Sequence, residues 1–245
     1  MLNAFSIRTR MFALLAINIA FLVGVAIFTS AQLRSIGDEI EEIAELDVPI
    51  SALLTQVTTH QLKQAIHYER AVRYGEEMNY PSVPADVRAK AAELFEKEIK
   101  AFHKYSKLVV EEAEAIQAMH DVAVERALNA EALAHYDSVD ASIVQILEAH
   151  KVYDKHVVEL MDKLRAGEKD GVFAMIAAIE KEEEIFIKDL EETTTKVIAF
   201  TQETAKRAEE HEHAVETMLI YVTAIAVIFS ALISILIANS ILTPM

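Results

Sequence analysis

The side chains best suited to chemistry are the nine histidines, which all lie between residues 60 and 213. An apolar stripe that passes through Leu53 and Val57 continues, in alternating steps of three and four residues, to His60, Gln64 and His67. Polar groups on the buried face of a helix need partners or a ligand, because burial without them costs stability. The stripe therefore predicts a polar zone inside a helical core.

A helix rises about 1.5 Å per residue, so the height of each residue along a helix can be compared with its neighbours. On this scale His60, His103 and His150 share one level, and His67 and Glu183 share another about 10 Å farther along. Three or four helices thus contribute polar groups to one zone. The candidate ligand-binding residues of this zone are His60, Gln64, His67, Glu98, His103, His150, Tyr153 and Glu183.

Three interpretations of this zone remain open. Imidazole and carboxylate groups from facing helices can bind a divalent metal, here through His60, His103 and His150. The same groups can form a pocket for a small polar ligand. They can also form a hydrogen-bonded layer that fixes helix register, or simply face solvent.

An enzyme is not expected from this pattern. A di-iron oxidase needs Glu-x-x-His on two helices of a bundle, whereas the only match here is Glu210 with His213. The chain has no Cys, which excludes thiolate nucleophiles and disulfide frameworks. We therefore predict no catalytic residues.

The elements that must position these residues are helices, because 5 Gly and 4 Pro are too few to punctuate strands and turns. Breaks are expected at the cluster 75–84, near 128–130 and at 165–171, with a kink at Pro49. They leave four long helices, about 34–76, 85–127, 131–166 and 172–216. Core-facing positions on the middle two are Phe95, Ile99, Phe102, Ser106, Val109, Ala113 and Ile116, and Val139, Ile143, Ile146, His150, Tyr153, Val157, Leu160 and Leu164. These spacings predict an antiparallel bundle.

Charge divides the chain into an acidic centre and two apolar ends. No Asp or Glu precedes Asp38 or follows Glu216, and the net charge of -16 argues against nucleic acid as a partner. Residues 11–33 and 217–245 carry no charge, and each run is long enough for a helix that crosses lipid. The first could instead be a cleaved signal peptide, but its apolar part is longer than such peptides need. Arg8 and Arg10 place the N-terminus in the cytoplasm and the acidic centre outside.

Two membrane helices around an outer helical domain resemble the input half of a bacterial methyl-accepting chemotaxis receptor. The segments that carry the resemblance are 238–245, which is similar to the entry into a HAMP linker at Pro244, and 60–70, which is similar to part of a four-helix-bundle sensor domain. The resemblance implies a homodimer in the bacterial inner membrane. The sequence stops at Met245, before the HAMP body and signalling hairpin of such receptors, so we expect either a receptor fragment or a short protein that senses without its own output.

The expected fold is all-α, an antiparallel up-down four-helix bundle with two transmembrane helices continuous with its first and last helices. The expected domains are a cytoplasmic N-terminus (1–10), a first transmembrane helix (11–33), a periplasmic sensor domain (34–216), a second transmembrane helix (217–239) and the start of a HAMP-like linker (240–245). The expected function is ligand binding outside and a small helix displacement across the membrane. A histidine-kinase input half has the same layout, and a structural or partner-binding membrane protein without a small ligand is the alternative from another class.

Overall fold

The computed structural model describes residues 7–242, and all regular elements within that range are helices. In chain order they are α1 (Ile7–Glu42), the π-helical turn η2 (Ile43–Asp47), α2 (Val48–Met78), α3 (Ala85–Arg126), α4 (Ala130–Ala166) and α5 (Val172–Leu242). Contacts divide the chain into two compact units. The bundle unit comprises Glu42–Gln202, and the terminal-helix unit comprises the residues before and after it.

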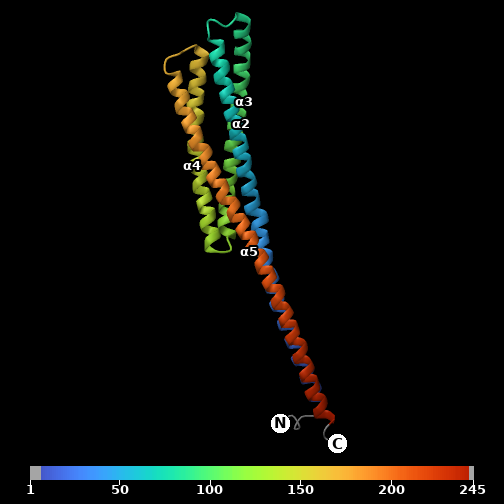
Figure 1. The fold of residues 1–245 in the computed structure, drawn as a ribbon. Coiled ribbons are helices and arrows are strands. Elements are labelled where there is room, and N and C mark those ends of the chain that lie inside the picture. The colour runs from blue at the N-terminus through green and yellow to red at the C-terminus, as the bar shows by residue number, and fades with distance from the viewer. Residues whose placement is uncertain (1–6, 243–245) are drawn as a thin grey trace. The chain divides into compact units, whose positions relative to one another are not determined.

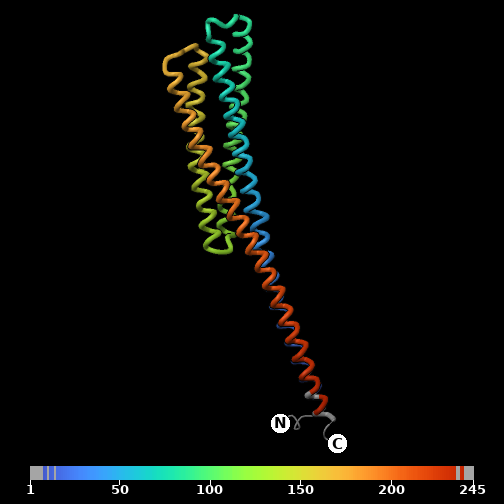
Figure 2. The backbone as a smooth tube through the Cα atoms, in the orientation of Figure 1, coloured from blue at the N-terminus to red at the C-terminus, as the bar shows by residue number. Residues whose placement is uncertain are grey.

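The bundle unit confirms the predicted all-α bundle. Figure 1 shows α2, α3, α4 and the first part of α5 side by side, and Figure 2 traces the three chain reversals that make neighbouring helices antiparallel. The reversals fall at residues 79–84, 127–129 and 167–171, where the sequence predicts them. The reversal at 127–129 contains no Gly or Pro, and the extended backbone of Asn129 starts α4 there.

Two reversals have clear local causes. Gly167 ends α4 with a positive φ of 73°, and the amides of Gly167 and Glu168 bond to the carbonyls of Leu164 and Lys163 at 3.1 and 3.0 Å. This is the hydrogen-bond pattern of a Schellman cap, in which glycine adopts the left-handed conformation without a steric penalty. The side-chain oxygen of Asn129 accepts from the amides of Glu131 and Ala132, and so satisfies two donors at the start of α4.

Replacing Asn129 by Ala is expected to lower the free energy of unfolding by about 1 kcal/mol, because two helix-terminal amides lose their acceptor. Thermal unfolding of the full chain in detergent, followed by helical circular dichroism, measures the loss. Asn129→Ser is the matched control, since serine retains a capping oxygen. An unchanged melting temperature for Asn129→Ala would show that the cap contributes nothing.

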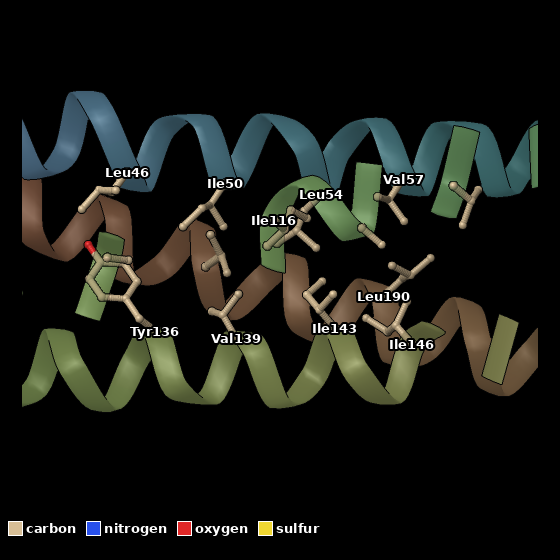
Figure 3. Packing of buried hydrophobic residues seen from close by; sticks show 14 of the residues in the cluster. Leu46, Ile50, Leu54, Val57, Ile116, Tyr136, Val139, Ile143, Ile146 and Leu190 are labelled. Atoms are coloured by element: carbon tan, nitrogen blue, oxygen red, sulfur yellow. The ribbon is translucent and has the colours of Figure 1, made fainter. Parts of the chain in front are cut away.

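The apolar core of the bundle unit forms two clusters, and each draws residues from all four helices. Figure 3 shows Leu54 from α2, Ile116 from α3, Ile143 from α4 and Leu190 from α5 meeting between the ribbons. All the predicted core-facing positions on α3 and α4 are buried, except the half-buried Ser106. The prediction for these two helices is therefore confirmed.

The buried face of α2 differs from the predicted one. The structure buries Leu54, Gln61 and Tyr68, whereas the prediction placed Leu53, His60 and His67 there. Two successive steps of four residues, from Leu46 through Ile50 to Leu54, shift the stripe by one position. The period of α2 is thus near the 3.6 residues of a straight helix, not the 3.5 of a coiled coil. The prediction was wrong by one residue at His60 and His67.

Near Pro49 the chain forms a wider helical turn in place of the predicted kink. The ring of Pro49 would clash with the carbonyl four residues earlier in a regular helix, which is the carbonyl of Glu45. The wider turn of η2 occupies Ile43–Asp47, so Glu45 lies inside it. The predicted break is therefore a π-helical turn that ends two residues before Pro49, and the helix continues on either side.

The terminal-helix unit pairs α1 with the C-terminal part of α5. Phe21 and Phe229 lie 6.1 Å apart between ring centroids, the hydroxyl of Ser230 bonds to the side-chain oxygen of Asn18, and His211 bonds to Glu39 at 2.8 Å. Two helical stretches, Met11–Met78 and Val172–Ile235, each contain a segment long and apolar enough to cross a membrane, and these segments are not buried by protein. Their composition agrees with the predicted spans. Of the predicted linker start, residues 243–245 lie outside the described range.

Candidate functional site

A hydrogen-bonded chain of three polar residues crosses the interior between α2 and α4. The ring nitrogen Nε2 of His150 donates to Oε1 of Gln64 at 3.0 Å, and Nε2 of Gln64 donates to Oδ1 of Asp154 at 3.2 Å. Gln64 is fully buried and His150 almost so. Burial lowers the pKa of His150, against the opposing charge of Asp154, so a neutral ring is the favoured form.

Two buried tyrosines lie next to these hydrogen-bonded residues, and their hydroxyl groups are unusual because they have no partner among the described residues. The rings of Tyr68 and Tyr153 meet edge to face with centroids 6.3 Å apart. Tyr68 is 2% exposed and Tyr153 is 0% exposed. Neither hydroxyl has a hydrogen-bond partner among the described residues. A buried hydroxyl without a partner costs about 1–3 kcal/mol, so this pair needs an explanation.

Gln61, one turn before Gln64 on the same face of α2, has the same property. It is fully buried, and neither its side-chain nitrogen nor its oxygen has a partner within the range that the structure describes. Together with the two tyrosines it makes a stretch of the interior, about 10 Å long on α2, polar but incompletely satisfied. Such a layer is the place where a ligand or ordered water is expected.

Carboxyl groups gather beside the tyrosines. Burial raises the pKa of Glu183 from 4.5 to about 7, and the charges of Glu69 and Glu180 raise it further. Burial also raises the pKa of Tyr68 and of Tyr153, and both shifts are increased by the charge of Glu183. Glu183 on α5 is therefore electrostatically coupled to both hydroxyls.

His60 and His67 face the flank of α2 towards α3. His60 bonds to Glu112 at 2.9 Å and His67 to Glu98 at 2.5 Å, and both rings lie against the ring of Tyr105. Their side chains are 18% and 20% exposed. Both histidines thus have structural partners outside the buried layer.

His103 is the predicted site residue that the structure separates from the rest. It is exposed on α3, with its ring against Phe102. No group of three or more metal-binding side chains comes together within residues 7–242. The structure thus does not assemble His60, His103 and His150 into the predicted triad. The reason is geometric: a common height along the helices does not place side chains on the same face.

Sequence reasoning identified Gln64 and His150, which a hydrogen bond joins, and Tyr153 and Glu183, which interact electrostatically. It missed Gln61, Tyr68 and Asp154. The shifted stripe on α2 explains the first two. Once Leu54 and Val57 are known to be buried, steps of four and three lead to Gln61, Gln64 and Tyr68.

A second buried polar cluster lies at the start of α2 and was also missed. The hydroxyl of Tyr136 donates to Asp47 at 2.8 Å and approaches Glu42 at 3.2 Å. Both acids are at least 96% buried. Burial raises the pKa of Asp47 from 3.8 to about 6, while the hydrogen bond from Tyr136 acts in the opposite direction.

Comparison with known families gives a direct result. The model of the family described as Tar ligand binding domain homologue matches residues 1–150. The chain belongs to this family. No curated protein and no solved structure matches it.

Membership in the Tar ligand-binding family fits what the structure shows. The matched residues include α1, α2, α3 and the part of α4 that ends with His150. The family supplies chemotaxis receptors with their periplasmic sensor domains, and it is not a family of enzymes. With the two apolar helices, this makes the chain a chemoreceptor-type transmembrane sensor of the inner membrane.

Proposed function

We propose that the chain is the input half of a chemoreceptor, which binds a small ligand in its periplasmic bundle and transmits a helix displacement across the inner membrane. The proposal rests on the match to the Tar ligand-binding family together with the continuity of α5 from the bundle into the apolar segment. This helix runs from Val172 to Leu242 and contains both a wall of the bundle and an apolar segment long enough to span lipid. A histidine-kinase input half would use the same layout.

We place the ligand at the incompletely satisfied layer. Gln64, His150 and Tyr153 form its buried wall and Glu183 its edge, with His60, His67 and Glu98 on the flank towards α3. His103 has no contact with this layer among the interactions of the described residues. A ligand that bonds to the free hydroxyl of Tyr153 would remove the cost of leaving that group unpaired.

The domain limits follow from the proposal. Residues 34–216 are the periplasmic domain, 11–33 and 217–239 are the two membrane segments, and both ends of the chain are cytoplasmic. Chemoreceptors commonly function as dimers, so we propose a homodimer in the membrane. Its remaining partner is lipid around the two apolar helices.

Transmission depends on the stiffness of α5. A shift of about 1–2 Å at one end of a helix reaches the other end only if the hydrogen-bonded ladder is unbroken. The residues Glu212, His213 and Ala214 are consecutive and exposed, and they precede the apolar segment. They offer a place where the ladder can be weakened with little loss of packing.

The test replaces these three residues with glycine in a chimera that joins the chain to the signalling half of a characterised chemoreceptor. Each glycine costs about 1 kcal/mol of helix stability relative to alanine. We expect the triple-glycine chimera to lose most of its ligand-induced output, measured as kinase inhibition. The control chimera carries Glu212→Ala and His213→Ala, so that all three positions are alanine; it removes the same charges and should respond like the parent.

The ligand for this test is found by screening the full chain for a rise in melting temperature against metabolites and metal ions, since a ligand that binds only the native state stabilises it. Equal output from the glycine and alanine chimeras would contradict transmission through α5. No hit across the screen would favour a structural or partner-binding membrane protein instead.

A further inference from the structure

The apolar core of the bundle unit is interrupted at one section by polar residues from all four helices. On one side lies the Ile143 core, which includes Leu54, Ile116, Ile143 and Leu190 (Figure 3). On the other side lies the Phe102 core, which includes Tyr68, Phe102, Tyr153 and Ile179. We call the polar residues between them the boundary layer; they are Gln61 and Gln64 on α2, Ser106 on α3, His150 on α4 and Glu183 on α5.

The boundary layer occupies positions where the apolar pattern of the core would otherwise continue. On α4, His150 lies four residues after Ile146 and three before Tyr153, and these two neighbours are at most 1% exposed. Steps of four and three residues mark the face of a helix that packs in a bundle. The same steps place Ser106 between Phe102 and Val109 on α3, and Glu183 between Ile179 and Phe186 on α5. One layer of polar residues therefore crosses the bundle.

Gln61 distinguishes this layer from a fully hydrogen-bonded one. It is fully buried, and neither its side-chain nitrogen nor its oxygen has a partner within the described range. One turn farther along α2, Gln64 bonds to His150 at 3.0 Å and to Asp154 at 3.2 Å. Among the side-chain hydrogen bonds of residues 7–242, those of the boundary layer join only α2 and α4. The layer is thus fastened between two helices, and Gln61 adds a buried amide but no bond.

An unpaired buried amide favours local opening of the helices around it. In the closed bundle the amide has lost its hydrogen bonds to water and gained none, and when the packing opens, water satisfies it again. A section of this kind therefore opens at a lower free energy than a continuous apolar core does. A role in fixing helix register would require a specific partner, and Gln61 has none in the described part of the chain.

We propose that the boundary layer divides the bundle into two cooperative units, the Ile143 core and the Phe102 core, which open separately, and that the amide of Gln61 keeps them separate. Each unit contains residues from all four helices, so each is a short bundle with its own apolar packing. This inference concerns motions of the chain without ligand and goes beyond the proposed function.

Hydrogen exchange of the full chain in lipid nanodiscs at pH 7, resolved by mass spectrometry of peptides, tests the division. Leu160→Ala removes a fully buried side chain from the Phe102 core. We expect exchange to become about tenfold faster or more in peptides of this core, because a large-to-small change destabilises the unit that contains it. Peptides of the Ile143 core should change by less than about twofold. Ile143→Ala should give the reciprocal pattern.

Gln61→Met tests the residue that keeps the units separate. Methionine has a similar length and no hydrogen-bond donor, so it fills the same space without an unpaired amide. We expect exchange on α2 between Val57 and Tyr68 to become about fivefold slower or more, because opening no longer returns lost hydrogen bonds to water. When Leu160→Ala is added to Gln61→Met, the faster exchange should spread into the Ile143 core. Gln56→Met, on the exposed face of α2, is the matched control and should exchange like the wild type.

Three results would overturn the inference. Equal acceleration of both cores by Leu160→Ala alone would show that the bundle is one cooperative unit. Unchanged or faster exchange in Gln61→Met, or failure of this variant to fold as judged by helical circular dichroism, would show that the amide is satisfied by water and supports the packing. Equal slowing by Gln61→Met and Gln56→Met would show that the effect does not depend on burial.

The boundary layer has a consequence for signalling that rests on the proposed function. If the two cores open separately, α5 can shift in one core without repacking of the other. We therefore expect the Gln61→Met chimera to need several-fold more ligand for half-maximal kinase inhibition than the parent chimera. Separate exchange of the two cores in a chain whose chimera never responds to ligand would uphold the boundary layer and contradict the sensor function. A responsive chimera with uniform exchange would do the reverse.

Discussion

Replacing Glu183 by glutamine is expected to stabilise the protein at pH 8 by about 1–3 kcal/mol and to leave it close to wild type at pH 4. Burial first, and then the charges of Glu69 and Glu180, raise the pKa of Glu183 from 4.5 to about 7. The folded chain therefore holds this proton more tightly than the unfolded chain does. A difference of one pKa unit corresponds to about 1.4 kcal/mol.

The sign of the pH dependence follows from the same pKa values. Below pH 4.5 Glu183 is protonated in both states, and its favourable contribution is fully present. As the pH rises from 4.5 through 7, unfolding releases a proton from this group, so the wild type loses stability. Above pH 7 the folded chain carries the full cost of a crowded, partly buried carboxylate. Glutamine cannot ionise, so the variant should lose less stability over this range.

Chemical denaturation of the full chain in detergent, repeated from pH 4 to 8, measures this effect. Glu184→Gln is the matched control, because Glu184 is exposed on the next position of α5. The control should follow the wild-type pH profile. A Glu183→Gln profile parallel to that of the wild type would show that Glu183 is ordinarily solvated.

The bundle could be predicted largely from the sequence because α3 and α4 repeat apolar residues at regular spacing. On α4, steps of three and four from Val139 to Leu164 are all buried. The same rule failed on α2, where the steps from Leu46 to Ile50 to Leu54 are both four. A heptad rule accumulates error over a straight helix, since 3.6 residues make a turn. An error of one position was enough to place His67 on the buried face of α2, where the structure has Tyr68.

The sequence predicted how far along each helix the site residues lie, but not which way their side chains point. Counting residues along helices brought Gln64, His150 and Tyr153 into one zone, and the structure joins the first two through a hydrogen bond. The same count gave His103 an equivalent height, although its side chain faces solvent. Contacts between helices depend on the rotation of each helix about its axis, which no single helix encodes.

The buried chain of Gln64 and His150 gives the second large prediction, a strong energetic coupling between the two residues. His150→Leu leaves Oε1 of Gln64 without its donor, and Gln64→Leu leaves Nε2 of His150 without its acceptor. Each single variant should lose about 1–3 kcal/mol, the cost of a buried polar group left unpaired. The double variant removes both groups, so its loss should be smaller than the sum of the singles by about 2 kcal/mol. Asp154 is half-buried and can reach water when the amide of Gln64 is gone.

Equilibrium unfolding of the four proteins of this cycle, at pH 7 in detergent, measures the coupling. The control cycle combines His150→Leu with Asn129→Ala, which lies about 30 Å away along α4 at 1.5 Å per residue. That pair should be additive within about 0.5 kcal/mol, because distant sites share no partners. Additivity in the Gln64–His150 cycle as well would mean that the hydrogen bond between them contributes nothing, and that water satisfies both groups. A coupling near 2 kcal/mol would show instead that Gln64 and His150 satisfy each other. The polar groups of this layer that remain without a partner among the described residues would then be Gln61, Tyr68 and Tyr153.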